Sequence, residues 1–397
     1  MVRQLLKALY GHPKAGQLWN QKFVQFMTTR GFIQSERDKC FFYNLKAEFF
    51  LVLYVDDLIA AALHVKQLNR FWGQLQSVFK VRDMGEPKHF LGMEISHIFQ
   101  HGLVAISQRR YVEKLAKRFE LPDTERPLTP IRTDYYERLT ASADEPILQH
   151  QPYKELVGAL IFVMVSTRPD IAFAVSCLTT HFSSPKSLHW ETANRCLGYL
   201  CATSTFGLIL GKGGSDSVVS YSDSDWAGNP LTRRSIGGHC VFFGTSIISW
   251  SSKTQKGILA LSTTESEFIE MALAIRQVLY LQPLFREIGF NNIQNSTVIF
   301  GDNQPAISSV GNDSAKSRTK HIDVRLKFCG EVIRQGLLQI KYVPTIENTA
   351  DIFTKPLPTT RFRQLRDSLV SDISFIQNNN QHATANAIFA IKRAIGF

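Results

Sequence analysis

The chain has 397 residues, of which 44% are hydrophobic, and this length predicts two or three domains instead of one. Its 45 lysines and arginines exceed its 34 aspartates and glutamates, and the net charge of +11, spread along the whole length, favours a polyanionic partner such as nucleic acid. The six cysteines form no CxxC pair and no zinc-type spacing with histidine, which argues against a metal held by sulfur and favours reduced thiols in an intracellular protein.

The first 130 residues mix helical stretches with short apolar strands, as in an α+β domain, and their start lacks the apolar core of a signal peptide. The stretch LVLYVDDLIAA sets Asp56 and Asp57 in an apolar run. It predicts strands Leu51–Val55 and Leu58–Leu63 with both aspartates at a solvated tip, because aspartate tolerates turn geometry. A second interpretation is a cation site, because Mg²⁺ binds through one or two carboxylates and keeps positions open for phosphates. The two interpretations are compatible.

Residues 121–151 are rich in Pro, Thr, Asp and Glu, lack apolar periodicity and predict a connecting loop. Helical signals dominate from Tyr153 to Thr203. The longest apolar run, Leu156–Val165, is far shorter than the roughly 20 residues of a membrane span, so it predicts a buried helix and no membrane partner. After the turn-rich segment GKGGSDS the pattern changes to strands.

The last part predicts a sheet flanked by helices. Strands come first, at Val218–Asp223, at Gly237–Gly244 and in SIISWSSKT, with GILALS continuing the meander. A long helix from about Thr264 has its apolar residues on one face. It is followed by strand TVIFGD, a short helix opened by Pro305, a helix through HIDVRLKFCGEVIRQG, strand LLQIKYVP and a short helix near ENTADIFTK. From about Ser371 the tail is rich in Asn and Gln, and no structure is assigned to it.

Four acidic residues lie at equivalent places in this last part. Asp223 ends the first strand and Asp302 ends strand TVIFGD, while Glu267 opens the long helix and Asp351 lies in the last helix. If the strands of Asp223 and Asp302 are neighbours, the four carboxylates can converge at one edge of the sheet. Convergent carboxylates can bind two Mg²⁺ ions about 4 Å apart, which activate a water and stabilise the leaving oxygen of a phosphodiester. The pattern therefore predicts metal-assisted phosphodiester hydrolysis.

Each acid also has a purely structural interpretation. Glu267 and Glu265 each follow a hydroxyl residue by three positions, so either could complete a capping box at the start of the long helix. Asp302 could cap the short helix that follows it, and Asp351 could be a surface acid. Taken singly, the structural interpretation is favoured for each residue. Only their joint placement favours a metal site.

Ten segments of the chain are recognisable in order: ALYGHPKAGQLWNQKF, YVDDLI, HFLGMEIS, STRPDIAFAV, YSDSDWAGNPLTRRSIGGHCVFFG, ISWSSKTQK, LSTTESEF, GDNQPAI, SRTKHIDVR and KYVPTIENTADIFTKPLP. From about Leu5 to Leu365 they closely resemble the C-terminal Pol region of Ty1/copia-type LTR retrotransposons, in which reverse transcriptase is followed by RNase H. The resemblance implies α+β and α/β parts. A partial palm and thumb start would occupy residues 1–130, a helical connection 131–215, an RNase H-like domain with a mixed five-stranded sheet 216–357, and a partly disordered tail 358–397.

By this resemblance YVDD is the polymerase motif, with Asp56 binding catalytic metal, Asp57 beside it on a palm hairpin and Tyr54 near the primer terminus. MGEPKHFLGMEI resembles the primer-gripping hairpin. ISQRRYVEKLAKRF resembles the start of the thumb, whose basic residues face either backbone phosphates or solvent: Arg109, Arg110, Lys114, Lys117 and Arg118. The family's polymerase site needs a further aspartate well upstream of the LYG segment, which this chain does not contain, so nucleotide addition by this chain alone is expected to fail.

The same resemblance assigns the catalytic and metal-binding carboxylates of RNase H to four acids: Asp223, Glu267, Asp302 and Asp351. Asp225 competes with the first of these and Glu265 with the second. The candidates for contact with an RNA–DNA hybrid are six residues: Arg233, Arg234, Lys253, Lys320, His321 and Arg325. Many cellular RNases H carry a mobile histidine shortly before the last aspartate, and the corresponding stretch VPTIENTAD has none.

Two functional hypotheses follow. The first is a fragment of a reverse transcriptase and RNase H that uses Mg²⁺, with Mn²⁺ as the alternative ion, to cleave RNA in an RNA–DNA hybrid. Its expected partners are hybrid, primer–template nucleic acid and the remainder of the Pol polyprotein, in cytoplasmic virus-like particles or the nucleus. The second is a degenerate or repurposed copy that binds nucleic acid through its basic surface without cutting it. The complete set of four acids favours the first.

Overall fold

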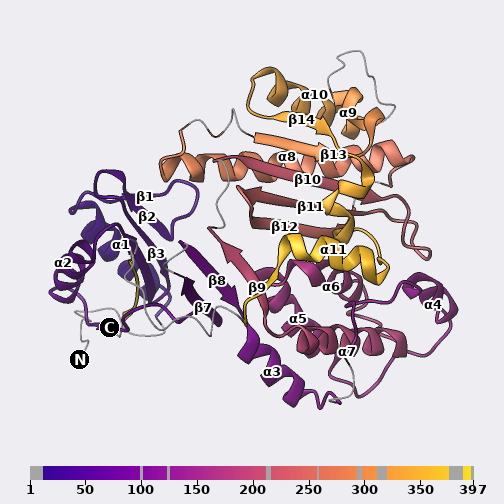
Figure 1. The fold of residues 1–397 in the computed structure, drawn as a ribbon, viewed down its shortest axis with the longest axis horizontal. Coiled ribbons are helices and arrows are strands. Elements are labelled where there is room, and N and C mark those ends of the chain that lie inside the picture. The colour runs from indigo at the N-terminus through magenta and orange to yellow at the C-terminus, as the bar shows by residue number, and fades with distance from the viewer. Residues whose placement is uncertain are drawn as a thin grey trace, which may run out of the picture.

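The computed structural model describes residues 12–98, 102–122, 126–211, 216–256, 259–291, 293, 297–310, 320–374 and 388–394, and for residues 98, 320–323 and 388–394 the backbone alone. Within these ranges the chain forms three sheets and a layer of helices (Figure 1). Figure 1 shows the N-terminal sheet at one end of the molecule and the last sheet stacked over the helical layer at the other. The predicted combination of α+β and α/β parts is confirmed.

The N-terminal sheet is antiparallel throughout, in the order β1-β2-β3-β4-β16-β5. Its strands are β1 (Ile33–Gln34), β2 (Phe41–Asn44), β3 (Phe49–Tyr54), β4 (Asp57–Ala62), β5 (Val81–Asp83) and β16 (Ile388–Ala394). Buried residues alternate along β3 and β4, which gives the sheet one apolar face. That face packs through a phenylalanine-rich cluster onto helices α1 (Ala15–Thr28) and α2 (Val65–Gln76). β16 lies in the tail to which the sequence assigned no structure.

A second sheet, in the order β15-β9-β8-β7-β6, joins distant parts of the chain. Its strands are β6 (His89–Phe90), β7 (Met93–Ile98), β8 (Leu103–Ser107), β9 (Phe206–Leu210) and β15 (Ser371–Asp372). The predicted hairpin of β6 and β7 is confirmed, and it turns at Leu91 and Gly92, which both have positive φ. β9 pairs with β8 although the helical layer separates them along the chain. Strands from three of the predicted ranges, 1–130, 131–215 and 358–397, therefore share one sheet.

The helical layer contains α3 (Arg109–Arg118), α4 (Tyr135–Ala141), α5 (Tyr153–Ser166), η3 (Pro169–Ile171), α6 (Ala172–Thr179) and α7 (Ser187–Ala202). The run Leu156–Val165 lies inside α5 and buries most of its apolar side chains, so the predicted buried helix is confirmed. The loop predicted for residues 121–151 is wrong where α4 forms. α4 is anchored by Tyr135 and Leu139, which are buried one turn apart. Two apolar residues one turn apart are too few for hydrophobic periodicity in the sequence to reveal a helix.

The last sheet has the order β12-β11-β10-β13-β14, antiparallel from β12 to β10 and parallel from β10 to β14. Its strands are β10 (Val218–Asp225), β11 (Ile236–Phe243), β12 (Ser246–Thr254), β13 (Thr297–Gly301) and β14 (Gln339–Tyr342). One face packs on α8 (Thr263–Glu287), α9 (Gln304–Val310) and α10 (Lys320–Arg334). The predicted mixed five-stranded sheet is confirmed. The strand predicted in GILALS is wrong for its described residues 259–262, which form a loop before α8.

α8 is long and apolar enough, by length and composition, to cross a membrane, but 56% of its most apolar window is buried inside the fold. It is the central helix of the core on that side of the sheet, with Phe268, Met271 and Ile275 fully buried. The burial of this helix against the sheet accounts for its apolar composition.

The opposite face of the last sheet packs on the helical layer. Ile236 and Cys240 of β11 share one core with α5, α6 and α7. The short helix η6 (Thr349–Phe353) and α11 (Thr359–Leu369) enter the same core through Phe353 and Phe362. In Figure 1, α11 is drawn in yellow between β12 and α6. α11 falls in the range 358–397 that the sequence assigned to the tail, so an ordered helix opens that range.

Candidate functional site

Three carboxylates meet at one end of the β10–β13 pair. These parallel strands are in register at Tyr221 and Phe300, so Asp223 and Asp302, each two residues further on, reach the same edge of the sheet. Glu267 lies in the second turn of α8, which packs on β10. Asp223, Glu267 and Asp302 each contribute one carboxylate oxygen, and these three oxygens lie within 4.8 Å of one another. The sequence-based expectation that these acids converge holds for all three.

Water has little access to these carboxylates. Asp223 is 2% and Glu267 5% exposed, Asp302 is half-buried, and the Ser224 backbone N–H donates to Glu267 Oε1 at 3.2 Å. Burial raises the pKa of Asp223 to about 6 against the opposing charge of Lys355. Burial, and after it the charges of Asp223 and Asp302, raise the pKa of Glu267 to about 9. Crowded hard oxygens of this kind fit a divalent cation such as Mg²⁺, which would relieve their repulsion.

The fourth predicted acid, Asp351 of η6, is 4% exposed and contacts two cations. Lys355 Nζ lies 2.7 Å from Asp351 Oδ1 and 3.6 Å from Asp223 Oδ2, and Arg361 Nη2 donates to Asp351 Oδ2 at 3.0 Å. Burial lowers the pKa of Lys355, but the charges of Asp223 and Asp351 outweigh it and hold that pKa above its usual range. Lys355 thus joins Asp351 to the other acids. We refer to the four acids together as the carboxylate cluster: Asp223, Glu267, Asp302 and Asp351.

Two contacts bring η6 to the edge of the sheet. Asn348 Nδ2 donates to the Ser222 carbonyl at 3.0 Å, while Asn348 Oδ1 caps η6 by accepting from the Ala350 N–H at 3.1 Å. A Cβ on Gly238 would lie 2.4 Å from Phe353 Cβ, so only glycine at this position lets η6 approach β11 so closely. Asp351 is therefore placed by the contacts that Asn348 and Phe353, on either side of it, make with the sheet.

The capping roles considered for two of the acids belong to their neighbours. The Glu265 N–H donates to Ser262 Oγ at 3.2 Å at the start of α8, so Glu265 takes the capping position and Glu267 is left for the cluster. At the start of α9 the side chain of Asn303 accepts the capping hydrogen bond at 2.8 Å, in place of Asp302. The structural interpretations of Glu267 and Asp302 are therefore wrong. The surface interpretation of Asp351 is contradicted by its burial.

Asp225, which competes with Asp223 in the sequence, lies elsewhere. Its carboxylate lies over the turn that follows β10, because a Cβ on Gly228 would lie 1.9 Å from Asp225 Oδ2. It is absent from the described group of three oxygens within 4.8 Å. The geometry favours Asp223 over Asp225.

Sequence reasoning missed the two cations that contact Asp351. Lys355 follows Asp351 by four positions, the spacing at which helical side chains pair, and this signal could have indicated it. Arg361 lies on α11 beyond an irregular segment, and no local pattern connects it with Asp351.

The raised pKa values predict how pH acts on the metal-free chain. Asp223 and Glu267 have folded pKa values of about 6 and 9 against ordinary values of 3.8 and 4.5, so the folded chain holds their protons more tightly than the unfolded chain. Their contribution to stability is full below pH about 4 and is lost as the pH rises to about 9. Melting temperatures measured from pH 5 to 9, with Mg²⁺ or with EDTA, should show a Mg²⁺-induced increase that grows with pH. A Mg²⁺ effect independent of pH would contradict this prediction.

The other acidic pair lies on the β3–β4 hairpin, but only one of its members is at the turn. Tyr54 pairs with Asp57, so Val55 and Asp56 form the two-residue turn, and the prediction that both aspartates lie at the tip is wrong for Asp57. The register explains this, because Leu53 pairs with a buried leucine of β4 and fixes the turn two residues later. Tyr54 is 53% exposed.

Val55 holds a strained backbone conformation at this turn. Its φ of 56° is unusual for a β-branched residue and costs about 1–3 kcal/mol. Val55→Gly should therefore raise the free energy of unfolding by about 1 kcal/mol, because the released strain exceeds the entropic cost of glycine, about 0.5–1 kcal/mol. Urea denaturation followed by the fluorescence of Trp19 and Trp72 measures this. Val52→Gly, inside β3, should destabilise the chain, and a loss of stability in Val55→Gly would contradict the prediction.

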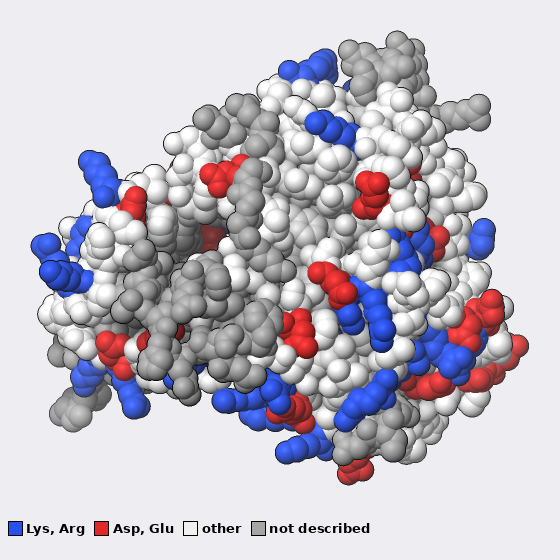
Figure 2. All heavy atoms as spheres, in the orientation of Figure 1, with Lys and Arg blue, Asp and Glu red and all other residues white. Residues whose placement is uncertain are grey.

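The predicted nucleic-acid contacts lie on three parts of the last sheet and its helices. Arg233 and Arg234 are exposed in the loop before β11, Lys253 is exposed on β12, and Arg325 is half-buried on α10. The side chains of the other two lie outside the described part of the chain: Lys320 and His321. On the face shown in Figure 2, lysines and arginines are scattered and interspersed with acids. A role for these residues in binding nucleic acid stays a prediction.

Three of the five basic residues predicted at the thumb start on α3 contact glutamates. Arg109 Nε lies 2.9 Å from Glu113, and Arg118 pairs with Glu155 of α5. The third, Arg110, lies 4.0 Å from a glutamate of β7. Exposed pairs of this kind contribute only about 0–1 kcal/mol, so a phosphate could replace the carboxylate at small cost.

Comparison with known proteins gives consistent relatives. Residues 1–133 match the family described as reverse transcriptase (RNA-dependent DNA polymerase). The chain is 32% identical over 375 residues to the Retrovirus-related Pol polyprotein from transposon TNT 1-94 of Nicotiana tabacum, across 92% of the chain and 28% of that polyprotein. It is also 32% identical to the Pol polyprotein from transposon RE2 of Arabidopsis thaliana, across 91% of the chain and 24% of that protein. The chain therefore spans about a quarter of the length of these curated relatives.

Solved structures give weaker likenesses. A foamy viral protease-reverse transcriptase in complex with double-stranded DNA matches 83% of the chain and 49% of its own length, with a TM-score of 0.46 and 11% identity. The RNase H1 of Halobacterium salinarum NRC-1 matches 35% of the chain and 94% of its own length, with a TM-score of 0.26 and 17% identity.

Proposed function

Because the chain belongs to the Ty1/copia-type family of retrotransposon Pol polyproteins, we propose that its residues 216–357 cleave the RNA strand of an RNA–DNA hybrid by metal-assisted phosphodiester hydrolysis. The observation that supports this most directly is the gathering of four acids from four separate elements at one edge of the last sheet. The capping roles that could have explained two of them are taken by neighbouring residues.

The residues of the cluster have separable roles in this proposal. Asp223, Glu267 and Asp302 hold the ion, because their hard oxygens lie within 4.8 Å of one another. The bound ion supplies an activated water and stabilises charge on the leaving oxygen of the phosphodiester. Glu267, with its pKa near 9, holds a proton at neutral pH in the metal-free site and releases it when the ion binds. Arg361 fixes the orientation of Asp351 through Oδ2.

The remaining parts of the chain supply contact with nucleic acid in this proposal. Exposed Arg233, Arg234 and Lys253 bind backbone phosphates, and the net charge of +11 makes this binding weaken with salt. On the β3–β4 hairpin, Asp56 takes the polymerase metal position with Asp57 beside it, and Tyr54 lies near the primer terminus. These assignments come from the family to which the chain belongs.

The test is a cleavage assay on a hybrid with a labelled RNA strand. The full chain should cut the RNA strand in Mg²⁺ and leave it intact in EDTA. A hybrid left intact in both Mg²⁺ and Mn²⁺ would contradict the proposal. If the chain then still bound hybrid in a salt-sensitive manner, the result would favour the non-catalytic copy.

A further inference from the structure

One cation of the chain lies inside the carboxylate cluster. Lys355 Nζ is 2.7 Å from Asp351 Oδ1 and 3.6 Å from Asp223 Oδ2, so it bridges two of the four acids. Asp223 also belongs to the group of three oxygens within 4.8 Å formed with Glu267 and Asp302. Two cation positions therefore share Asp223. One is lined by three carboxylates, and the other lies between two carboxylates and holds an ammonium group.

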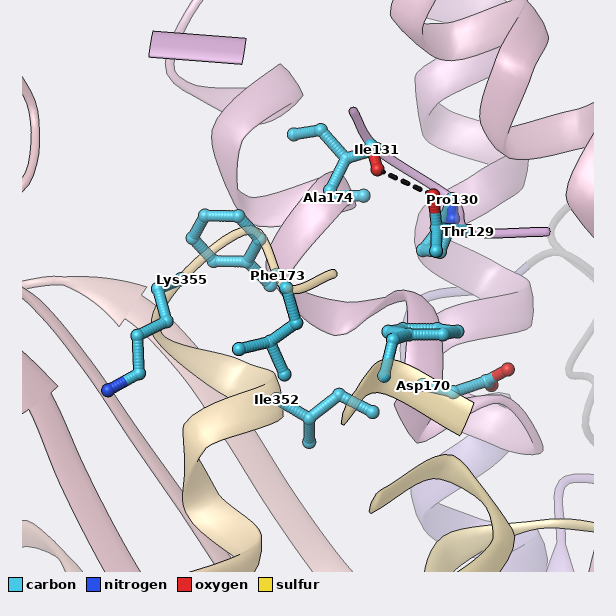
Figure 3. Close-up of a pocket in the computed structure, with 10 residues that line it drawn as sticks. Thr129, Pro130, Ile131, Asp170, Phe173, Ala174, Ile352 and Lys355 are labelled. Atoms are coloured by element: carbon cyan, nitrogen blue, oxygen red, sulfur yellow. Dashed lines mark hydrogen bonds between the residues drawn. The ribbon is translucent and has the colours of Figure 1, made fainter. Parts of the chain in front are cut away.

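The ammonium of Lys355 is held at this position by its two carboxylate contacts, and its stem lies beside apolar side chains. Figure 3 shows that the stem lines a small cavity with Ile352 and Phe173, and that the ammonium points out of the cavity toward the strands. The Lys355 side chain is about one-third exposed, and Asp351 and Asp223 are almost fully buried. A buried carboxylate pair of this kind requires a positive charge.

The position between Asp223 and Asp351 is already taken by a cation. A second divalent ion there would need oxygens that Lys355 already contacts. It would also lie close to an ammonium that repels it.

We propose that Lys355 takes the place of the second metal ion, so that the cluster binds a single divalent cation at Asp223, Glu267 and Asp302. This inference rests on the proposed function for the identity of the ion. It deepens that proposal, because hydrolysis would then use one metal ion and one lysine ammonium in place of two metal ions.

The test counts bound Mn²⁺ by electron paramagnetic resonance. It uses the full chain with Asp56→Asn and Asp57→Asn, so that the β3–β4 hairpin contributes no ion. This chain should bind one equivalent. Adding Lys355→Met, which keeps the apolar stem and removes the charge, should raise the count to two equivalents. Lys341→Met on exposed β14 is the matched control and should leave one equivalent.

The count in the chain that retains Lys355 decides the proposal even if Lys355→Met does not fold. Two equivalents there, or none, would overturn it, and so would a folded Lys355→Met variant that still binds one. Cleavage of hybrid is scored separately. One bound ion without cleavage would support the Lys355 assignment and contradict the proposed function. Two bound ions with cleavage would contradict the Lys355 assignment and support the proposed function.

Discussion

Asp302→Asn should lower Mg²⁺-dependent cleavage of the RNA strand at least about 100-fold. Loss of a group that merely orients a metal ligand costs about 10–100-fold, and Asp302 is proposed as a direct ligand. Asparagine keeps the shape of the side chain but removes one of the three charged oxygens that lie within 4.8 Å of one another. The fold should survive, because the substitution relieves repulsion at the cluster and because Asn303 provides the cap of α9.

Two further aspartate variants make this result specific. Asp367→Asn removes an exposed carboxylate on α11 that pairs with Arg366 and not with the cluster, and should leave cleavage within about twofold of the unsubstituted chain. Asp223→Asn should match the loss seen in Asp302→Asn. Cleavage is measured from initial rates with labelled hybrid, and circular dichroism confirms folding. Cleavage retained by a folded Asp302→Asn variant would contradict the assignment of Asp302.

The convergence of the cluster was predictable because it depends on strand ends. A strand that closes on an acid places that acid at the edge of its sheet, and parallel neighbours place their ends together, as with Asp223 and Asp302. The same reasoning does not place the cations. The spacing of four residues could have indicated Lys355, but Arg361 reaches Asp351 only because η6 and α11 pack between the sheet and the helical layer. That packing depends on contacts such as the one permitted by Gly238, which local pattern does not encode.

The fold shows the same division between local and non-local information. Alternation along β3 and β4 predicted a hairpin, but the position of its turn came from the burial of Leu53 against β4 and not from the turn preference of aspartate. The pairing of β9 with β8 joins residues on either side of the helical layer. Hydrophobic periodicity identifies a strand but not its partner. The boundary expected at residue 130 from the family resemblance therefore separates β8 and β9, which lie in one sheet.

Asp170→Asn should destabilise the chain by about 3–5 kcal/mol, because it leaves a buried arginine without its counter-charge. Arg168 is bound at Nε and Nη2 by the two oxygens of Asp170, at 2.9 and 2.7 Å, and the side chains are 3% and 0% exposed. Tyr199 donates to the same carboxylate at 2.6 Å, and Arg168 donates to the Thr203 carbonyl at 2.9 Å. This network ties η3 to α7 inside the core that also holds η6. Urea denaturation followed by circular dichroism measures the loss.

The chain contains a matched pair that isolates the effect of burial. Arg132 and Asp134 have the same spacing and the same two contacts, at 2.9 and 3.0 Å, but their side chains are 49% and 36% exposed. Asp134→Asn should therefore cost less than about 1 kcal/mol, because water solvates the arginine that it leaves behind. Equal losses in Asp134→Asn and Asp170→Asn would show that hydrogen-bond geometry, and not burial of the charge, sets the energy of these pairs.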